Sequence, residues 1–284
     1  MRAFSKTEDQ VENNAGQVLN AARGAANWIK ADKSKFFSEV MILIPRDESR
    51  IDYDCGKTAS ALEEMLRMQP PDEDKFTSNI SIHEVKHGDL FCGVLNYGVT
   101  KLLREGIDYV GIISSGASSY LTAENMNAIY QAFEGGAKAA GLAIEELQQS
   151  ILEGRLANTF AFWDAIALMS VGGFDLRAQQ PKKDDRTAPY LRGFGSDLYY
   201  PLAGVEEIIP LTRLVSTFGP CIAPIKPAGA AVWKAPNPAT DPEGAARHQK
   251  KMGTKFERQA ALAASVGADL SYLQYGVMEQ YVPH

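Results

Sequence analysis

Two adjacent carboxylates, Glu206 and Glu207, stand at the beginning of a segment whose apolar residues recur at helical spacing, from 204 to 218. The helix dipole favours acidic residues at the start of a helix, so one interpretation is structural capping. A partly buried carboxylate beside a cleft can also act as a general base and take a proton from a hydroxyl group. The residues alone leave both interpretations open.

A run of small polar residues at 114–119, Ser-Ser-Gly-Ala-Ser-Ser, lies between an expected strand and an expected helix. Backbone N–H groups and hydroxyls at Ser114, Ser115 and Gly116 could bind a phosphate without a metal ion. The alternative is an ordinary capping loop, because small polar residues commonly precede helices.

Charged residues follow the first expected strand and fill later loops. Arg46, Asp47 and Glu48 either contact a nucleoside or are solvated loop charges. Weaker candidates for acid–base chemistry, metal binding or diphosphate binding are His87, Asp89, Asp164, Asp175, Lys182, Lys183 and Arg186. Each of these has a plainer interpretation as a surface or turn residue. The basic residues from 247 to 258 are interpreted as a charged helix face.

The elements that must hold these residues alternate between strands and helices. Apolar runs predict strands at 40–45, 80–85 and 109–113, and helical spacing predicts helices at 7–31, 59–68, 91–105 and 122–133. Such alternation is typical of an open, mostly parallel, Rossmann-like α/β sheet covered by helices. Ligands bind beyond the carboxyl ends of the strands in such sheets, so the loops at 46–54, 86–89 and 114–119 are expected to share one cleft.

The second half of the chain is less regular. The pattern predicts a helix at 137–153, a strand within 158–169, a helix at 204–218, a strand at 220–225 and one or two helices within 241–280. Residues 178–203 show no clear period, which is unusual for a loop inside a compact domain. We therefore expect an N-terminal helical extension at 1–36, an α/β domain at 37–235 and a C-terminal helical extension at 236–284. The extensions could pack on the domain or form a homodimer.

The composition limits the class of protein. With 284 residues, 45% hydrophobic and 23% charged, the chain is expected to fold rather than remain disordered. A net charge of −6 gives no general attraction for nucleic acid. The three cysteines lack the spacing of a zinc site or a disulfide framework. No segment resembles a signal peptide or approaches the ~20 apolar residues of a membrane span, so the expected location is the cytoplasm.

Five segments carry short motifs in a fixed order. They are VMILIP at 40–45, ALEEMLRMQ at 61–69, NYG at 96–98, VGGFD at 171–175 and VEEIIPLTRLVSTFG at 205–219. In this order they resemble the nucleotide-sugar-dependent glycosyltransferases with the GT-A fold, in particular the large inverting family-two group. The resemblance runs from about residue 40 to residue 225.

The resemblance implies a GT-A-like sheet and the transfer of a sugar, with inversion, from a nucleotide-sugar donor to an unknown acceptor. It implies that Glu207 is the catalytic base, with Glu206 beside it. The residues implied to bind the nucleotide sugar are Pro45, Arg46, Glu48, Ser114, Ser115 and Gly116, and those on the acceptor side are Gly172, Gly173 and Asp175.

The segment after the third expected strand departs from the family pattern. There the family has an Asp-x-Asp motif that holds Mg²⁺ or Mn²⁺ on the donor diphosphate, whereas this chain has Ser114-Ser115-Gly116. Hard divalent cations prefer carboxylate oxygens, so the metal ligands are unknown. One alternative function is a catalytically degenerate GT-A-like scaffold that binds a ligand or protein partner without turnover. Another is a different doubly wound protein, such as a nucleotidyltransferase or a phosphate-binding module.

Overall fold

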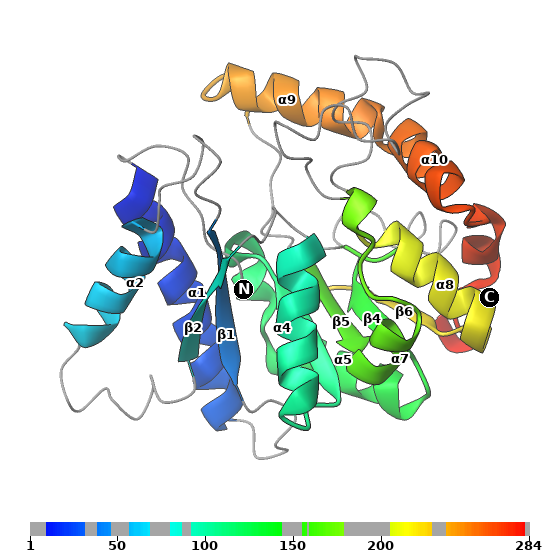
Figure 1. Cartoon of the computed structure of the whole chain (residues 1–284), viewed down its shortest axis with the longest axis horizontal. Helices are drawn as coiled ribbons and strands as arrows, with labels where there is room; N and C mark the ends of the chain where they lie inside the picture. Colours follow the sequence, from blue (N-terminus) through cyan, green and yellow to red (C-terminus); the bar gives the residue numbers. More distant parts are fainter. Residues whose placement is uncertain are drawn as a thin grey trace.

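The chain folds into a mixed α/β structure whose described strands form two small sheets (Figure 1). The computed structural model describes residues 10–31, 39–46, 57–68, 80–86, 92–143, 155–157, 159–178, 205–228 and 237–281. Helices pack on both faces of each sheet. The α/β class predicted from the alternation of strands and helices is therefore confirmed.

The smaller sheet pairs β1 (Val40–Arg46) with β2 (Ile80–Lys86) in parallel. Successive side chains of a strand point to opposite faces. One row of β1 side chains is buried with apolar residues of α1 (Val11–Ala31) and α2 (Lys57–Arg67). The alternate row packs against α4 (Cys92–Arg104). The fully apolar run that predicted β1 is explained by this burial on both faces.

The larger sheet holds four strands, in the order β3 (Tyr109–Ile113), β5 (Phe160–Asp164), β4 (Ala139–Leu142) and β6 (Ile222–Ile225). Strand β5 runs antiparallel to both of its neighbours, whereas β4 and β6 are parallel. The sheet therefore differs from the mostly parallel one that the sequence predicted.

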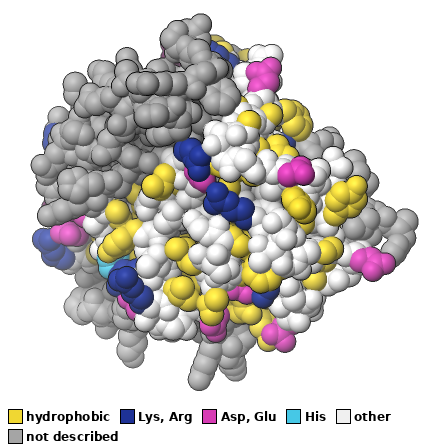
Figure 2. Space-filling model, turned by 45° about the vertical axis from the view of Figure 1, so that its right-hand side comes forward, with side chains coloured by type: hydrophobic (Ala, Val, Ile, Leu, Met, Phe, Trp, Pro, Cys, Tyr) yellow, Lys and Arg dark blue, Asp and Glu magenta, His cyan; other side chains and the backbone are white. Residues whose placement is uncertain are grey.

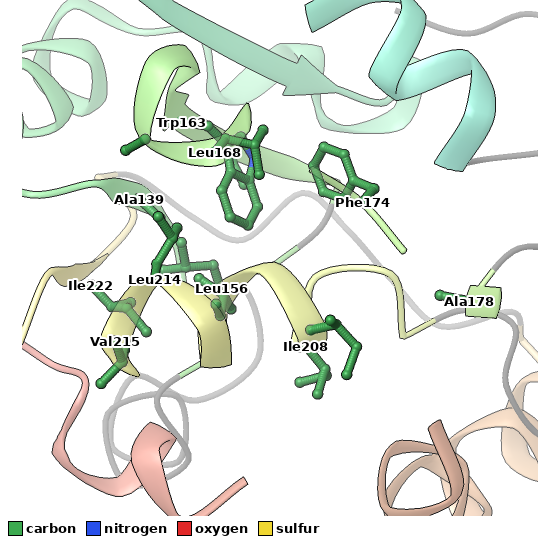
Figure 3. Close-up of a cluster of buried hydrophobic side chains, with 14 of the residues drawn as sticks. Ala139, Leu156, Trp163, Leu168, Phe174, Ala178, Ile208, Leu214, Val215 and Ile222 are labelled. Carbon is green, nitrogen blue, oxygen red and sulfur yellow. The ribbon is translucent and has the colours of Figure 1, made fainter. Parts of the chain in front are cut away.

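Two helical layers cover the larger sheet. On one face lie α5 (Ala123–Glu134) and the short 3-10 helix η3 (Ser115–Tyr120). On the other lie α7 (Ala165–Ser170), α8 (Ile208–Phe218) and α10 (Lys255–Val266). Figure 3 shows this second layer, where apolar side chains of α8 meet Trp163, Leu168 and Phe174. This core fixes the start of α8, which carries the acid pair.

The expected helix at 137–153 is wrong at its beginning, where β4 lies instead. All four residues of β4 are buried between β5 and β6. A Cβ at Gly141 would lie 2.9 Å from the backbone oxygen of Phe160, so the neighbouring strand leaves room only for a small residue. The small residues at 139–142, which resemble a helical pattern, are therefore present because a strand buried between two others needs small side chains.

The ends of the described chain are helical and pack on the sheets. Helix α1 contacts β1, α2 and η3. At the other end, α9 (Pro242–Gly253) leads into α10, which lies against α8, and two short 3-10 helices follow, η7 (Leu270–Tyr275) and η8 (Glu279–Tyr281) (Figure 1). The expected boundaries at 36/37 and 235/236 stay a prediction.

The described surface mixes side chains of different kinds. On the face shown in Figure 2, the described Lys and Arg side chains are scattered among acidic and apolar ones. No helix in the described part of the chain is long and apolar enough to cross a membrane.

Candidate functional site

Asn96 on α4 holds the Gly-Gly turn, which lies far along the chain. Its Nδ2 donates a hydrogen bond to the backbone oxygen of Phe174 at 2.8 Å, and the backbone N–H of Phe174 donates to its Oδ1, also at 2.8 Å. The asparagine side chain thus satisfies both polar backbone groups of Phe174, as a neighbouring strand would. Two of the five sequence motifs are therefore in direct contact.

Glycines make this contact possible. Gly172 and Gly173 have φ angles of +93° and +65°, which other residues rarely adopt. A Cβ on Gly173 would lie 2.6 Å from Oδ1 of Asn96. On α4, a Cβ at Gly98 would lie 2.7 Å from a methyl group of Leu43 in β1. The glycines therefore allow α4 to approach both β1 and the turn closely.

Asp175 connects the turn to α8 and α10. Its carboxylate accepts a hydrogen bond from Nη2 of Arg213 on α8 at 3.3 Å. It also accepts one from Nε of Arg177, in the short helix η4 (Leu176–Ala178), at 3.0 Å. Arg177 in turn donates from Nη1 to the backbone oxygen of Ser265 on α10 at 2.6 Å. The structure thus uses Asp175 to join three segments through charge-assisted hydrogen bonds.

Glu206 and Glu207 lie at the start of α8, and both are almost completely buried, with 4% and 3% of their surface exposed. Glu207 immediately precedes the helix, but its side chain makes no capping hydrogen bond. Its Oε2 is buried and has no hydrogen-bond partner among the residues that the structure describes. Capping by the Glu207 side chain is therefore not the reason for this carboxylate.

The surroundings of Glu207 shift its ionisation toward neutral pH. Burial raises the pKa of Glu207 from 4.5 to about 7, and the neighbouring charge of Glu206 also raises it. The positive charges of Lys255 and Arg155 act in the opposite direction. A carboxyl group with a pKa near 7 can accept and release a proton at neutral pH, as a general base must.

The first two turns of α10 bring further groups to the acid pair. Lys255, Arg258 and Gln259 are spaced so that they share one face of the helix. Arg258 and Gln259 are buried, with 5% and 4% exposed. Burial lowers the pKa of Arg258, whereas the charges of Glu206 and Glu207 raise it. The interpretation of residues 247–258 as a charged face in solvent is therefore wrong for Arg258.

Sequence reasoning missed part of this cluster. Arg258 and Gln259 precede the buried Leu262 and Ala263 by four positions each, so a polar pair on the apolar stripe of the helix was a usable signal. Arg155 carried no local signal, because its hydrogen-bond partner Gln259 lies 104 residues later. Only the fold shows that these residues belong together.

The run of small polar residues begins η3. The backbone N–H of Ser114 donates to the backbone oxygen of Thr159 at 2.8 Å, and the Ser118 hydroxyl donates to the backbone oxygen of Ser115 at 2.9 Å. The side chain of Ser114 makes no capping hydrogen bond. Gly116 is exposed, and a Cβ there would meet no atom within 4 Å. The triplet supplies hydroxyl and backbone groups at this end of β3, and no carboxylate.

Asp164 is a structural residue. Its Oδ1 accepts from the N–H of Ala167 at 2.9 Å and caps α7, while its Oδ2 accepts from Nζ of Lys138 at 2.8 Å. Within the described ranges, no group of three or more His, Cys, Asp and Glu side chains could hold a metal ion. The metal ligands therefore stay unassigned.

The other predicted site residues divide into two groups. Pro45 and Arg46 are the last residues of β1, paired with Val85 and Lys86 of β2. The residues that lie outside the described ranges are Asp47, Glu48, His87, Asp89, Lys182, Lys183 and Arg186. The common cleft predicted for the strand-end loops stays a prediction, because two of the three loops fall there.

Comparison with known proteins assigns no family to the chain. No protein-family model matches it, and no curated protein or solved structure matches it significantly. Its function is therefore inferred from the contacts among the motif segments and from the surroundings of Glu207.

Proposed function

We propose that this protein is a GT-A-like glycosyltransferase that transfers a sugar, with inversion, from a nucleotide-sugar donor to an acceptor hydroxyl. The observation that supports it best is the connection of three motif segments: Asn96 binds the backbone of Phe174, and Arg213 of the acid-pair helix binds Asp175. Each segment resembles the same family in sequence. The contacts show that these segments belong to one structural unit, in which the helix that carries Arg213 begins directly after the buried acid pair.

In this proposal Glu207 is the general base of a single displacement. The oxygen of the acceptor hydroxyl attacks the anomeric carbon, and the bond from that carbon to the donor phosphate oxygen breaks. The hydroxyl proton passes to the Glu207 carboxylate, and the nucleoside diphosphate leaves with the electron pair of the broken bond. Burial raises the pKa of Glu207 to about 7, so this carboxyl can exchange a proton near neutral pH.

The acceptor would lie against Gly172, Gly173 and Asp175, in a turn that hydrogen bonds hold rigid. The donor would lie between the ends of β1 and β3, near Pro45, Arg46, Glu48, Ser114, Ser115 and Gly116. The triplet at 114–116 offers hydroxyl and backbone groups but lacks the carboxylate oxygens that Mg²⁺ and Mn²⁺ prefer, so it fits such an ion poorly. The proposed mechanism therefore includes no step through a metal ion.

A second candidate is a GT-A-like scaffold that binds a ligand or a partner without turnover. Two observations favour it: the triplet lacks carboxylates, and Glu207 is only 3% exposed. A base must touch the acceptor hydroxyl, so the enzyme requires Glu207 to become accessible when substrates bind. The scaffold requires no such opening.

Two measurements separate these functions. Calorimetric titration with UDP, GDP, CDP and dTDP and their sugar conjugates, with and without Mg²⁺ or Mn²⁺, tests whether a donor binds. Release of nucleoside diphosphate in the presence of candidate acceptors tests turnover. Glu207→Gln is compared with Glu243→Gln, which removes an exposed acid on α9.

If the protein is the proposed glycosyltransferase, the wild-type protein turns over. Glu207→Gln should then abolish turnover and Glu243→Gln should preserve it, with donor affinity unchanged in both variants. Donor binding without turnover in the wild-type protein would favour the scaffold. No binding of any nucleotide or nucleotide sugar at millimolar concentration would contradict the donor site and with it the proposed transferase.

A further inference from the structure

Two arginines share one carboxylate beside the Gly-Gly turn. Nη2 of Arg177 and Nη2 of Arg213 each donate a hydrogen bond to the same oxygen, Oδ2 of Asp175, at 3.3 Å. These two nitrogens are therefore at most twice that distance apart. The side chain of Asp175 is 9% exposed, whereas those of Arg177 and Arg213 are 32% and 33% exposed. One buried negative charge thus lies under two positive charges that reach the surface.

The charge of Asp175 is balanced without Arg213. Arg177 donates to both carboxylate oxygens, from Nε at 3.0 Å and from Nη2 at 3.3 Å, which is the paired geometry that an arginine forms with a carboxylate. In the described part of the chain, no other acidic side chain pairs with either arginine. Two cations held this close repel each other, so the turn carries one positive charge more than it needs.

Arg213 also keeps unused hydrogen-bond donors. A guanidinium carries five N–H groups. The contacts of Arg213 with described residues use two of them, one for Asp175 at 3.3 Å and one for the backbone oxygen of Val171 at 3.4 Å. Both distances are longer than usual for such a bond. Most of the hydrogen-bonding capacity of this guanidinium is therefore free for a ligand.

Gly172 leaves open space beside the same guanidinium. Gly172 is exposed and has a φ angle of +93°, which other residues rarely adopt. Apart from its chain neighbours, a Cβ added there would have one described atom within 4 Å, Nη1 of Arg213 at 3.4 Å. A ligand group could thus occupy the place of the missing side chain and contact Arg213 without displacing a described atom.

We propose that Arg213 and Arg177 form an anion-binding site at the Gly-Gly turn, and that the acceptor of the transferase carries a carboxylate or a phosphate that binds there. The identity of the ligand rests on the proposed function, which places the acceptor at this turn. The anion offsets the excess positive charge and accepts the free N–H groups of Arg213. Because charge-assisted bonds to a guanidinium are directional, they orient the acceptor before its hydroxyl reacts.

The test titrates the protein with small anions and needs no substrate. Protein labelled with ¹⁵N is titrated by NMR with inorganic phosphate and, separately, with acetate, and sodium chloride at the same ionic strength corrects for screening. We expect the backbone signal of Gly172 and the Nε signal of Arg213 to shift to saturation with phosphate or acetate and not with chloride. The anion that binds more tightly identifies the charged group of the acceptor.

Variants test the role of Arg213, with the Gly172 signal as the readout. Arg213→Gln removes the charge and should weaken binding about tenfold or more. Arg213→Lys keeps the charge but has no planar fork, so we expect a smaller loss of affinity. Arg67→Gln is the matched control and should bind as wild type does, because Arg67 is an exposed arginine of α2, at the opposite end of the molecule from α8 (Figure 1).

The absence of a saturable shift with both anions at tens of millimolar would overturn the proposal. So would wild-type affinity in an Arg213→Gln protein with a native circular dichroism spectrum. If Arg213→Gln does not fold, Arg213→Lys carries the comparison, and wild-type affinity in that variant would overturn the proposal as well.

A last titration separates the acceptor from the donor. Phosphate or acetate is added in the presence of a nucleoside diphosphate that calorimetry has shown to bind. The anion should still bind, because the acceptor and the donor occupy different places, whereas its displacement would assign the arginines to the donor and overturn the proposal. If no nucleotide binds, the transferase function is contradicted, and the anion site still stands or falls by its own titration.

Discussion

Replacing Glu207 with glutamine should stabilise the folded protein above pH 7, although it removes the proposed catalytic base. Glutamine has the shape of a protonated glutamate, so the packing at the start of α8 is preserved. In the wild-type protein, a rising pH forces a negative charge onto a carboxyl that is 3% exposed and has one oxygen without a partner in the described part of the chain. The variant carries no such charge at any pH.

The size of the effect follows from the two ionisation states. Glu207 titrates near its ordinary pKa of 4.5 in the unfolded chain and near 7 in the folded protein. The difference, 7 minus 4.5, is about 2.5 pH units, and each unit corresponds to about 1.4 kcal/mol. Because the folded state holds the proton more tightly, this contribution to stability is complete below pH 4.5 and is lost as the pH rises through 7. Wild type should therefore lose about 3 kcal/mol that the variant keeps.

The assay is urea unfolding of both proteins, followed by circular dichroism at five pH values from 4 to 8. The free energy of unfolding of Glu207→Gln should equal that of wild type near pH 4 and exceed it by about 3 kcal/mol at pH 8. Taking the difference between the two proteins removes the titration of all other groups. Glu243→Gln, at an exposed position of α9, should show no pH-dependent difference from wild type.

A constant difference between Glu207→Gln and wild type from pH 4 to 8 would refute the reasoning, because it would mean that Glu207 titrates alike in the folded and unfolded states. If this difference in the free energy of unfolding falls as the pH rises, the cations of α10 and Arg155 lower the pKa of Glu207 by more than burial raises it. Either result would remove the physical basis for Glu207 as a base at neutral pH.

Three further predictions concern the frame of the site. Gly173→Ala should destabilise the fold by about 2 kcal/mol in urea unfolding, because Gly173 has a positive φ and a Cβ there would collide with the asparagine side chain that holds the turn. The control Gly116→Ala should change stability by less than about 0.5 kcal/mol, because a Cβ there has open space. Asp164→Ala should cost about 1–2 kcal/mol through loss of a helix cap and a partly exposed ion pair, and calorimetry should find nucleotide affinity unchanged. In Cys55→Ser, neither remaining thiol should react with Ellman's reagent at pH 8 until the protein is unfolded, because both are buried and burial raises the pKa of Cys221 to about 12.

Local sequence patterns were sufficient where burial is uniform along an element. The apolar run at 40–45 predicted β1, and helical spacing predicted α4 and α8, because each buries a regular set of side chains. The pattern failed at β4, where alanine and glycine are needed for close strand packing and imitate a helix. It also missed the antiparallel direction of β5, since strand direction depends on the pairing partner and leaves no local signal.

The site was predictable to the extent that its residues lie in motifs. The Gly-Gly-Phe-Asp turn, the Asn-Tyr-Gly segment and the helix with Glu207 and Arg213 were all marked in the sequence, and the fold connects them. The contribution of α10 was not predictable, because Arg155, Phe256 and Gln259 make their contacts across about one hundred residues of chain. The motifs marked the residues of α4, of the turn and of α8, whereas the side chains that surround them are found only through tertiary contacts.

The unpartnered oxygen of Glu207 bears on the choice between an enzyme and an inert scaffold. A carboxylate that serves only to join α8 to α10 would be expected to use both oxygens in ion pairs, as Asp175 does with its two arginines. Among the described residues, Oε2 of Glu207 has no hydrogen-bond partner, and the raised pKa of Glu207 predicts that its ionisation lowers the stability of the fold as the pH rises through 7. Strongly shifted acids with an unused hydrogen-bonding atom are typical of sites that handle protons. This arrangement favours the enzyme, and two experiments test its two requirements separately. The pH dependence of urea unfolding tests for a carboxyl that titrates near pH 7, and the turnover assay tests for a substrate hydroxyl that can reach it.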